Sequence, residues 1–119
     1  MSGFAKLRNV VLECPDPKAL SEFYRELTGW TVVGEEADWV SLSSDGGLRL
    51  AFQEAPGYQP PVWPDDASPM QFHLDFTVDD LDEAGKLAVE LGATKFLHQP
   101  GDDFEVYADP VGHPFCLCL

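Results

Sequence analysis

One pattern occurs twice in this sequence, and the two copies lie 64 positions apart, so that Asn9 corresponds to His73 and Leu20 to Ala84. Each copy begins with a short apolar segment, continues with a helical pattern and ends with three β-rich segments. A repeat at a fixed spacing indicates one supersecondary unit that has been duplicated. The sequence therefore predicts two β-α-β-β-β modules in one chain.

Both helical patterns carry a start signal and a stop signal. Asp16 and Asp80 suit the N-cap position, because a short side chain with an acceptor oxygen can bind the first free N–H groups of a helix. Gly29 and Gly92 close the two patterns, as is typical of helix C-termini. Between these ends the apolar residues follow helical spacing, at Leu20, Phe23, Tyr24 and Leu27 and at Ala84, Leu87, Ala88 and Leu91.

The remaining segments of each copy are rich in β-branched and aromatic residues, which favour strands. We expect strands at residues 9–14, 30–36, 39–44 and 48–53 in the first copy, and at 73–78, 94–99, 104–109 and 113–119 in the second.

The two copies are joined by residues 55–69, which hold five of the ten prolines and therefore form no central strand. We expect a long, stiff connection over the surface. Tyr58 and Trp63 lie on it and have two interpretations. They fill the seam between the modules, or they cover a ligand site, because long loops often carry function.

The charge is strongly lopsided, since 7 basic and 21 acidic residues give a net charge of −14. This charge argues against nucleic acid and anionic membranes as partners, because both are themselves negative. Two interpretations stay open. The charge serves solubility, or its field concentrates a cationic ligand.

Several features favour a cytoplasmic location. No apolar run reaches the ~18 residues of a membrane span, and the N-terminus lacks the basic and apolar regions of a secretory signal. Cys14, Cys116 and Cys118 are odd in number and form no disulfide framework. Reduced thiols are the rule in the cytosol.

Three stretches carry a resemblance to a known family: NVVLECPDPKALSEFYRELTGWTVV at 9–33, HLDFTVDDLDEA at 73–84 and DPVGHPFCL at 109–117. They resemble the vicinal oxygen chelate superfamily of glyoxalases, bleomycin resistance proteins and dioxygenases, and look closest to its small glyoxalase-like domains. The resemblance implies an α+β fold, in which two βαβββ modules form a curved mixed sheet with a concave cavity. We expect a single glyoxalase-like domain at 1–119, with modules at about 5–54 and about 70–119 and the connection at 55–69.

The resemblance also implies where a metal would bind. Enzymes of the superfamily hold a divalent metal through the first and last strands of each module, positions that fall here on Asn9, Ala51, His73 and Cys116. Ala51 has no donor atom, Asn9 offers only a neutral amide oxygen, and the usual acidic ligands are missing. We therefore expect no cofactor. If a metal is present, His73 and Cys116 are its ligands.

A zinc site formed by His73, Cys116 and Cys118, with Asp75 as a fourth group, is a separate hypothesis. Cys116 and Cys118 lie two positions apart on one expected strand, which separates them by ~7 Å. That distance is too large for two sulfurs at ~2.3 Å from one zinc ion. The set therefore requires a bent strand.

Residues two positions apart on a strand share a face, so Gln53 lies with Ala51 and Asp75 with His73. His73 itself keeps three interpretations: a hydrogen-bonded wall residue, a contact to a ligand, or a metal ligand. We expect the cavity to be lined by Asn9, Ala51, Gln53, His73, Asp75, Cys116, Trp39 and Trp63.

The missing metal donors favour a metal-free protein that binds a small molecule. We expect its ligand to be cationic or aromatic, for example an antibiotic. The sequence assigns no catalytic residue. The acidic charge resembles that of the bleomycin resistance proteins. One alternative is a metal-dependent lyase, isomerase or dioxygenase with a non-standard metal site. Another is a module that serves assembly alone. Members of the superfamily often form homodimers, so we expect a homodimer, and modules pairing within or between chains both stay open.

Overall fold

The computed structural model describes residues 3–4, 6–69 and 72–119. The chain divides into two compact units, Met1–Tyr58 and Gln59–Leu119, which we call the first and the second unit. The boundary between them falls inside the proline-rich connection. The first residues expected for the second module, 70 and 71, lie outside the described residues.

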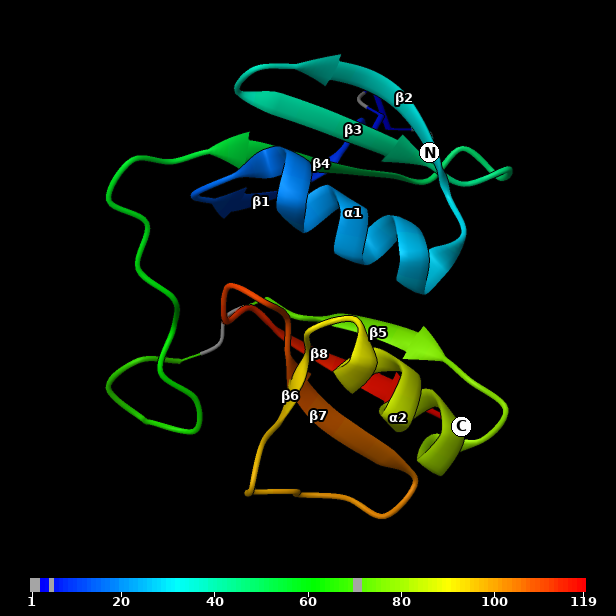
Figure 1. Ribbon diagram of the computed structural model, residues 1–119, viewed down its shortest axis with the longest axis vertical. Coiled ribbons are helices and arrows are strands. Elements are labelled where there is room, and N and C mark those ends of the chain that lie inside the picture. The colour runs from blue at the N-terminus through cyan, green and yellow to red at the C-terminus, as the bar shows by residue number, and fades with distance from the viewer. Residues whose placement is uncertain (1–2, 5, 70–71) are drawn as a thin grey trace. The chain divides into compact units, whose positions relative to one another are not determined.

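The first unit contains one helix and a four-stranded sheet (Figure 1). The sheet order is β1-β4-β3-β2, in which β1 runs parallel to β4 and the other neighbours are antiparallel. The elements are β1 (Val10–Cys14), α1 (Pro17–Thr28), β2 (Thr31–Glu36), β3 (Trp39–Ser43) and β4 (Arg49–Glu54).

The second unit repeats this topology with the sheet order β5-β8-β7-β6. Its first and last strands again pair in parallel, and its other pairs are antiparallel. The elements are β5 (Leu74–Thr77), α2 (Leu81–Glu90), β6 (Thr94–Lys95), β7 (Phe104–Ala108) and β8 (Pro114–Cys118). The predicted α+β class and the two βαβββ modules are thus confirmed.

Both helices begin at the predicted N-caps. A side-chain oxygen of Asp16 accepts hydrogen bonds from the backbone N–H groups of Lys18 and Ala19, at 3.1 and 3.3 Å. Asp80 accepts one from the N–H of Glu83 at 3.1 Å. These bonds satisfy donors that the first turn of a helix would leave unpaired.

The ends of the two helices differ slightly. Gly29 caps α1 with φ 75° and donates its N–H to the carbonyl of Arg25. In the second helix the cap is Leu91, and Gly92 follows it with φ 119°. Glycine suits both positions because a positive φ is costly for residues that carry a Cβ.

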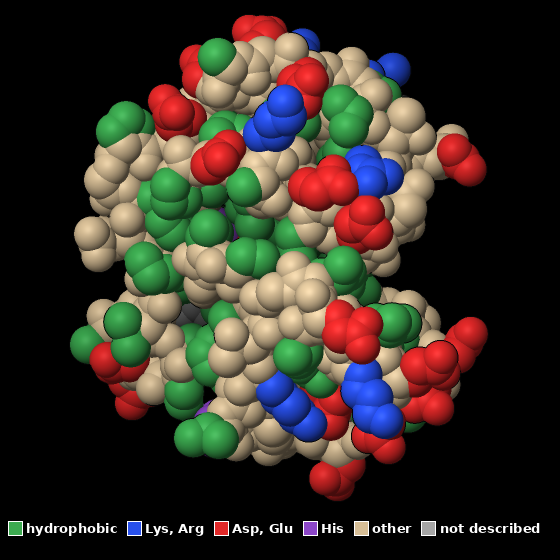
Figure 2. Space-filling model, viewed as in Figure 1, with side chains coloured by type: hydrophobic (Ala, Val, Ile, Leu, Met, Phe, Trp, Pro, Cys, Tyr) green, Lys and Arg blue, Asp and Glu red, His purple; other side chains and the backbone are tan. Residues whose placement is uncertain are grey.

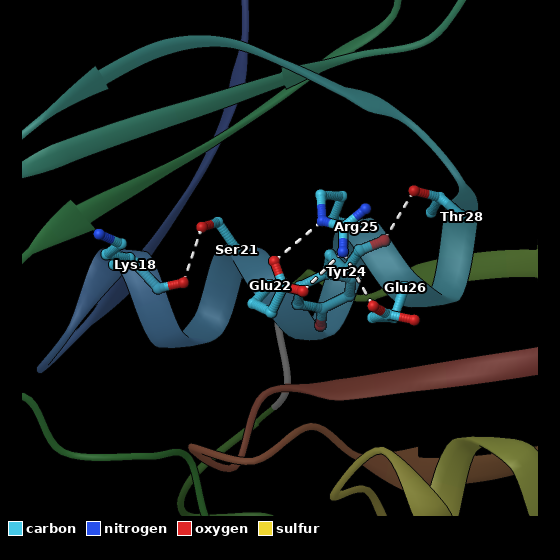
Figure 3. Close-up of polar contacts among 7 residues, drawn as sticks. All are labelled: Lys18, Ser21, Glu22, Tyr24, Arg25, Glu26 and Thr28. Atoms are coloured by element: carbon cyan, nitrogen blue, oxygen red, sulfur yellow. Dashed lines mark hydrogen bonds and ion pairs between the residues drawn. The ribbon is translucent and has the colours of Figure 1, made fainter.

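The outer face of α1 carries polar contacts within the helix (Figure 3). Arg25 pairs with Glu22 at 2.6 Å and with Glu26 at 2.8 Å, and Thr28 donates to the carbonyl of Tyr24 at 2.6 Å. Exposed ion pairs of this kind add little stability. The helix is held instead by its buried face, where the Tyr24 ring stacks on Phe52 with 5.5 Å between the ring centroids.

The core of the second unit depends on a close approach of α2 to its sheet. Tyr107 is 2% exposed and stacks on Phe115 at 5.8 Å. Its hydroxyl lies against the α2 backbone at Gly85, in the space that a Cβ would fill. Gly85 therefore lets the tyrosine fit beneath the helix.

One predicted strand is much shorter than expected. The sequence predicts a strand over residues 94–99, but the observed strand covers Thr94–Lys95, with one further backbone bond from the Phe96 N–H to the Val106 carbonyl at 3.2 Å. The Gln99 side chain replaces the rest of the pairing, because it donates to the Val106 carbonyl and accepts from the Val106 N–H, both at 2.9 Å.

Within the described part of the chain, neither helix combines the length and the apolar character that crossing a membrane requires.

We predict that Gly85→Ala lowers the free energy of unfolding by about 1–3 kcal/mol, the usual cost of overpacking a core. Alanine is normally the better helix residue by up to ~1 kcal/mol, so the sign of the effect is diagnostic. Urea unfolding measures it. In a Tyr107→Phe background the same change should cost less, because the hydroxyl that blocks the Cβ is gone. A Gly85→Ala protein as stable as the parent would contradict the close approach.

Candidate functional site

The sheet of the second unit has one face under α2 and one open face. Tyr107 and Phe115 lie on the helix side. Successive strand residues alternate between faces, and residues opposite each other in register share a face. Asp75 lies opposite Cys116, and Phe104 opposite Cys118. These four side chains are therefore on the open face, and His73, two positions before Asp75, joins them.

A pocket of about 320 Å³ lies on this open face. Its polar lining comes from His73, Asp75 and Asp103, and the remainder from Phe104, Cys116, Cys118 and Leu119. We call it the His73 pocket. Among the described residues that line it, none is Lys or Arg, so the fixed charge at this pocket is negative.

Three of these side chains meet closely. Nε2 of His73 lies 3.2 Å from Oδ1 of Asp75. The ligand atoms of His73, Asp75 and Cys116 all lie within 4.8 Å of one another. The imidazole and the carboxylate are accessible, with 42% and 62% of their side-chain surfaces exposed, whereas Cys116 is 5% exposed.

The cysteines are poor nucleophiles in this setting. Burial, followed by the charge and the hydrogen bond of Asp75, raises the pKa of the Cys116 thiol to about 12. Burial and Asp75 also raise the pKa of Cys118. Since the thiolate is the reactive form, both cysteines are neutral side chains of the pocket wall near pH 7 when no metal is bound.

The site residues predicted for the first unit also share a face. Ala51 lies opposite Val11 and Ser41, and Gln53 lies opposite Trp39. Ala51 is fully buried. The indole N–H of Trp39 donates to the Ser41 hydroxyl at 2.9 Å.

Asn9 stands just before β1 and presents an unsatisfied acceptor. Its side-chain Oδ1 is buried, and no donor meets it among the residues that the structure describes. A buried acceptor without a partner costs free energy. A water or a ligand N–H would satisfy it.

Trp63 belongs to a different cluster. Its ring contacts Phe96 edge-on at 4.8 Å and tilts against His98 at 5.5 Å, all within the second unit. It is not among the residues that line the His73 pocket.

Two lining residues, Asp103 and Phe104, were missed from the sequence. The repeat contained the signal for Phe104. Phe104 pairs with Cys118 as Trp39 pairs with Gln53, so Phe104 is the counterpart of Trp39, which the sequence predicts to line the cavity.

The residues present do not fit a four-ligand metal site of the kind that the resemblance implies. Of the four expected positions, Ala51 has no donor atom and Asn9 has only a neutral amide. The side chains that do come together are His73, Asp75 and Cys116, all from the second unit. Cys118, the further zinc ligand of the second hypothesis, is not in this group within the part of the chain that is described.

Residues 9–118 match the family described as "Glyoxalase-like domain". No curated protein matches the sequence.

Solved structures with the same fold include three with informative names. A glyoxalase/bleomycin resistance protein/dioxygenase family enzyme from Burkholderia phytofirmans is 20% identical, with a TM-score of 0.75 and coverage of 95% of this chain and 97% of that one. A glyoxalase family protein from Enterococcus faecalis is 23% identical, with a TM-score of 0.70 and coverage of 98% of both chains.

The third is a mutant of the fosfomycin resistance protein FosX from Listeria monocytogenes, complexed with Mn(II) and 1S,2S-dihydroxypropylphosphonic acid. It is 15% identical, with a TM-score of 0.74 and coverage of 98% of this chain and 90% of that one. At these identities the likeness establishes the fold alone.

We predict that Cys116 reacts slowly with iodoacetamide, because a pKa of about 12 leaves roughly one thiol in ten thousand ionised at pH 8. Asp75→Asn removes a negative neighbour, so the pKa falls and alkylation accelerates, by roughly tenfold per pKa unit. Mass mapping of the modified peptide follows the rate, with Asp102→Asn as the matched control. Alkylation of wild-type Cys116 at the rate of a free thiol would contradict the raised pKa.

Proposed function

Because this chain belongs to the glyoxalase-like domain family, we propose that it binds a small cationic or aromatic molecule in the His73 pocket and needs no metal ion to do so. The observation that carries this proposal is the composition of the pocket. Two carboxylates, an imidazole and an aromatic ring converge on a space of about 320 Å³, with no Lys or Arg among its described lining residues.

The charges favour a cation at this pocket. Asp75 and Asp103 supply local negative charge, and both are exposed enough to reach a bound ligand. The Phe104 ring adds a face on which a flat or cationic group can rest. The net charge of −14 adds attraction at longer range.

The acidic charge of the whole surface is a separate matter. Figure 2 displays Asp and Glu side chains spread over the visible surface of each unit, with Lys and Arg beside several of them. This spread supports solubility as one role of the overall charge. Selectivity for a ligand would then come from the pocket residues and not from the net charge.

Ligand binding without a catalysed reaction also agrees with the protonated form of the Cys116 thiol. The nucleophile nearest to His73 would be Cys116, whose raised pKa keeps it protonated at neutral pH. His73 is then suited to donate or accept a hydrogen bond with a ligand.

A cytoplasmic homodimer completes the proposal. Cys14, Cys116 and Cys118 form no disulfide, which suits a reducing compartment. Analytical ultracentrifugation of the reduced protein tests the homodimer, and a monomer at high micromolar concentration would refute that part.

The alternative function is a metal-dependent lyase, isomerase or dioxygenase with a non-standard site. The close approach of His73, Asp75 and Cys116 favours it. The neutral residues at the Asn9 and Ala51 positions weigh against it, because a divalent charge would lack the usual acidic ligands. Turnover of a small dicarbonyl adduct that depends on added metal would favour the enzyme.

We predict that the pocket prefers N-methylquinolinium to methylnaphthalene, its neutral isostere, because only the first carries a charge for Asp75 and Asp103. Isothermal titration calorimetry at low salt measures both. Asp103→Asn should weaken the cation severalfold, and the loss should shrink at high salt as screening increases. Asp102→Asn is the matched control, since Asp102 does not line the pocket. Equal affinity for both probes would refute selection by charge.

We predict that His73→Ala leaves the fold intact and weakens the N-methylquinolinium complex by roughly tenfold or less, the range expected for one lost contact. The side chain is 42% exposed, so its removal leaves no large cavity. His98→Ala, at the Trp63 cluster, is the control. Unfolding of the His73 variant would favour a purely structural role for this residue.

A further inference from the structure

A second pocket of the second unit lies between α2 and the sheet. It has a volume of about 510 Å³, which falls within the ~300–1,000 Å³ of typical small-molecule sites. One wall comes from a face of α2, and the other from β6 and β7. We call it the Lys86 pocket. No residue lines both this pocket and the His73 pocket.

Strand pairing separates the two pockets. Tyr107 lies on the helix side of the sheet, and Glu105, two positions before it on β7, shares that face. Lys95 of β6 lies opposite Tyr107 in register, so its side chain joins them. Phe104 of the His73 pocket precedes Glu105 and therefore points to the other side. The two pockets thus lie on opposite faces of one sheet.

The sheet wall holds a carboxylate in a fixed position. The Tyr107 hydroxyl donates to Oε1 of Glu105 at 3.1 Å, and Nζ of Lys95 lies 2.8 Å from Oε2. Burial, followed by the hydrogen bond and charge of Glu105 and the charge of Asp82, raises the pKa of Tyr107 to about 12. The hydroxyl therefore stays neutral at pH 7, and the Asp82 carboxylate on α2 is near enough for its charge to act on it.

The helix wall carries charges of both signs. Asp82, Lys86 and Glu90 follow one another at four-residue spacing, so they lie along one side of α2. All three side chains are exposed. Among the residues that the structure describes, none forms an ion pair with Lys86. Its ammonium group is therefore available to a ligand.

Positive charge is scarce on this half of the chain. The sole Lys or Arg residues in the sequence from 59 to 119 are Lys86 and Lys95, and both line this pocket. Lys95 is already paired with Glu105. A ligand carboxylate therefore finds its best partner on the second unit at Lys86.

The mixture of charges selects the class of ligand. A simple anion would meet Lys86 but also the carboxylates of Asp82 and Glu90, and a simple cation would be repelled by Lys86. A zwitterion satisfies both signs. Side chains one helical turn apart are about 5–6 Å apart at Cβ, so Asp82 and Lys86 can both reach one small molecule. Leu81 and Val89 add apolar surface to the same lining.

We propose that the Lys86 pocket binds a free α-amino acid with a large apolar side chain. Lys86 pairs with its carboxylate, Asp82 pairs with its ammonium group, and its side chain rests against Leu81 and Val89. This site goes beyond the proposed function, because it neither uses nor requires the His73 pocket.

The test follows backbone amide chemical shifts of the full chain by NMR at low salt, with three probes. They are L-phenylalanine, phenethylamine, which lacks the carboxylate, and hydrocinnamate, which lacks the ammonium group. We expect L-phenylalanine to shift the Gly85 and Val89 amides and to leave those of Asp75 and Cys116 in place. Each of the other two probes should bind severalfold more weakly, because each loses one ion pair.

Variants assign the contacts. Lys86→Gln and Asp82→Asn should each weaken L-phenylalanine severalfold. Glu83→Gln is the matched control for Asp82→Asn, because Glu83 also lies in the first turn of α2 but does not line the pocket. Lys18→Gln, on α1, is the control for Lys86→Gln. All four side chains are exposed, so the fold should survive each change, and circular dichroism verifies it.

Several results would overturn the inference: no shift with millimolar L-phenylalanine, equal affinity for phenethylamine, or unchanged affinity in Lys86→Gln. Displacement of L-phenylalanine by N-methylquinolinium would also overturn it, since the amino acid would then occupy the His73 pocket. A chain that binds N-methylquinolinium alone refutes this site and leaves the proposed function standing. A chain that binds L-phenylalanine alone, with shifts at Gly85 and Val89, refutes the proposed function instead.

Discussion

The parallel pairing of the first and last strand in each unit is the constraint from which the site follows. In the second unit this pairing fixes Asp75 opposite Cys116, and the alternation of a strand then fixes His73 on the same side. A slip of one residue would turn the cysteine under the helix and Phe115 toward solvent. Burial of Phe115 and Leu117 therefore sets the register, and the register in turn sets the polar group.

Most of the fold was predictable because the same helix caps, apolar stripes and strand patterns occur in both copies of the repeat, and each copy supports the assignment of the other. Asp16 and Asp80 each suggest a helix start, and the same offset joins them to apolar stripes and strands. The end of the strand predicted from Thr94 was not predictable in this way. There a side-chain amide replaces backbone pairing. Nothing in the sequence around Gln99 indicates that its side chain will bind the Val106 carbonyl.

The candidate site was only partly predictable. The resemblance to the superfamily, mapped onto the repeat, pointed to His73 and Cys116, and strand alternation added Asp75. Asp103 lies just before a strand, where no alternation rule says on which side a side chain falls, and only the folded chain brings it to the pocket. Trp63 was chosen because it is aromatic on a long loop, yet its ring contacts Phe96 and His98. Loop residues have no regular periodicity, so the spacing of residues in the sequence does not predict which side chains they contact.

The short length of β6 bears on how the protein avoids aggregation through its edge strands. Edge strands offer free backbone groups that can template pairing with another chain. Beside β6 in the second sheet, the Gln99 side chain hydrogen-bonds both the N–H and the carbonyl of Val106, so these groups are not available to another chain. The outer edge of the first sheet is the longer β2, which is interrupted by a register shift after Val32 and ends in two glutamates. At the β2 and β6 edges, pairing with another chain is thus opposed by different means: a side chain binds the backbone groups beside β6, and a bulge and negative charges disfavour pairing at β2.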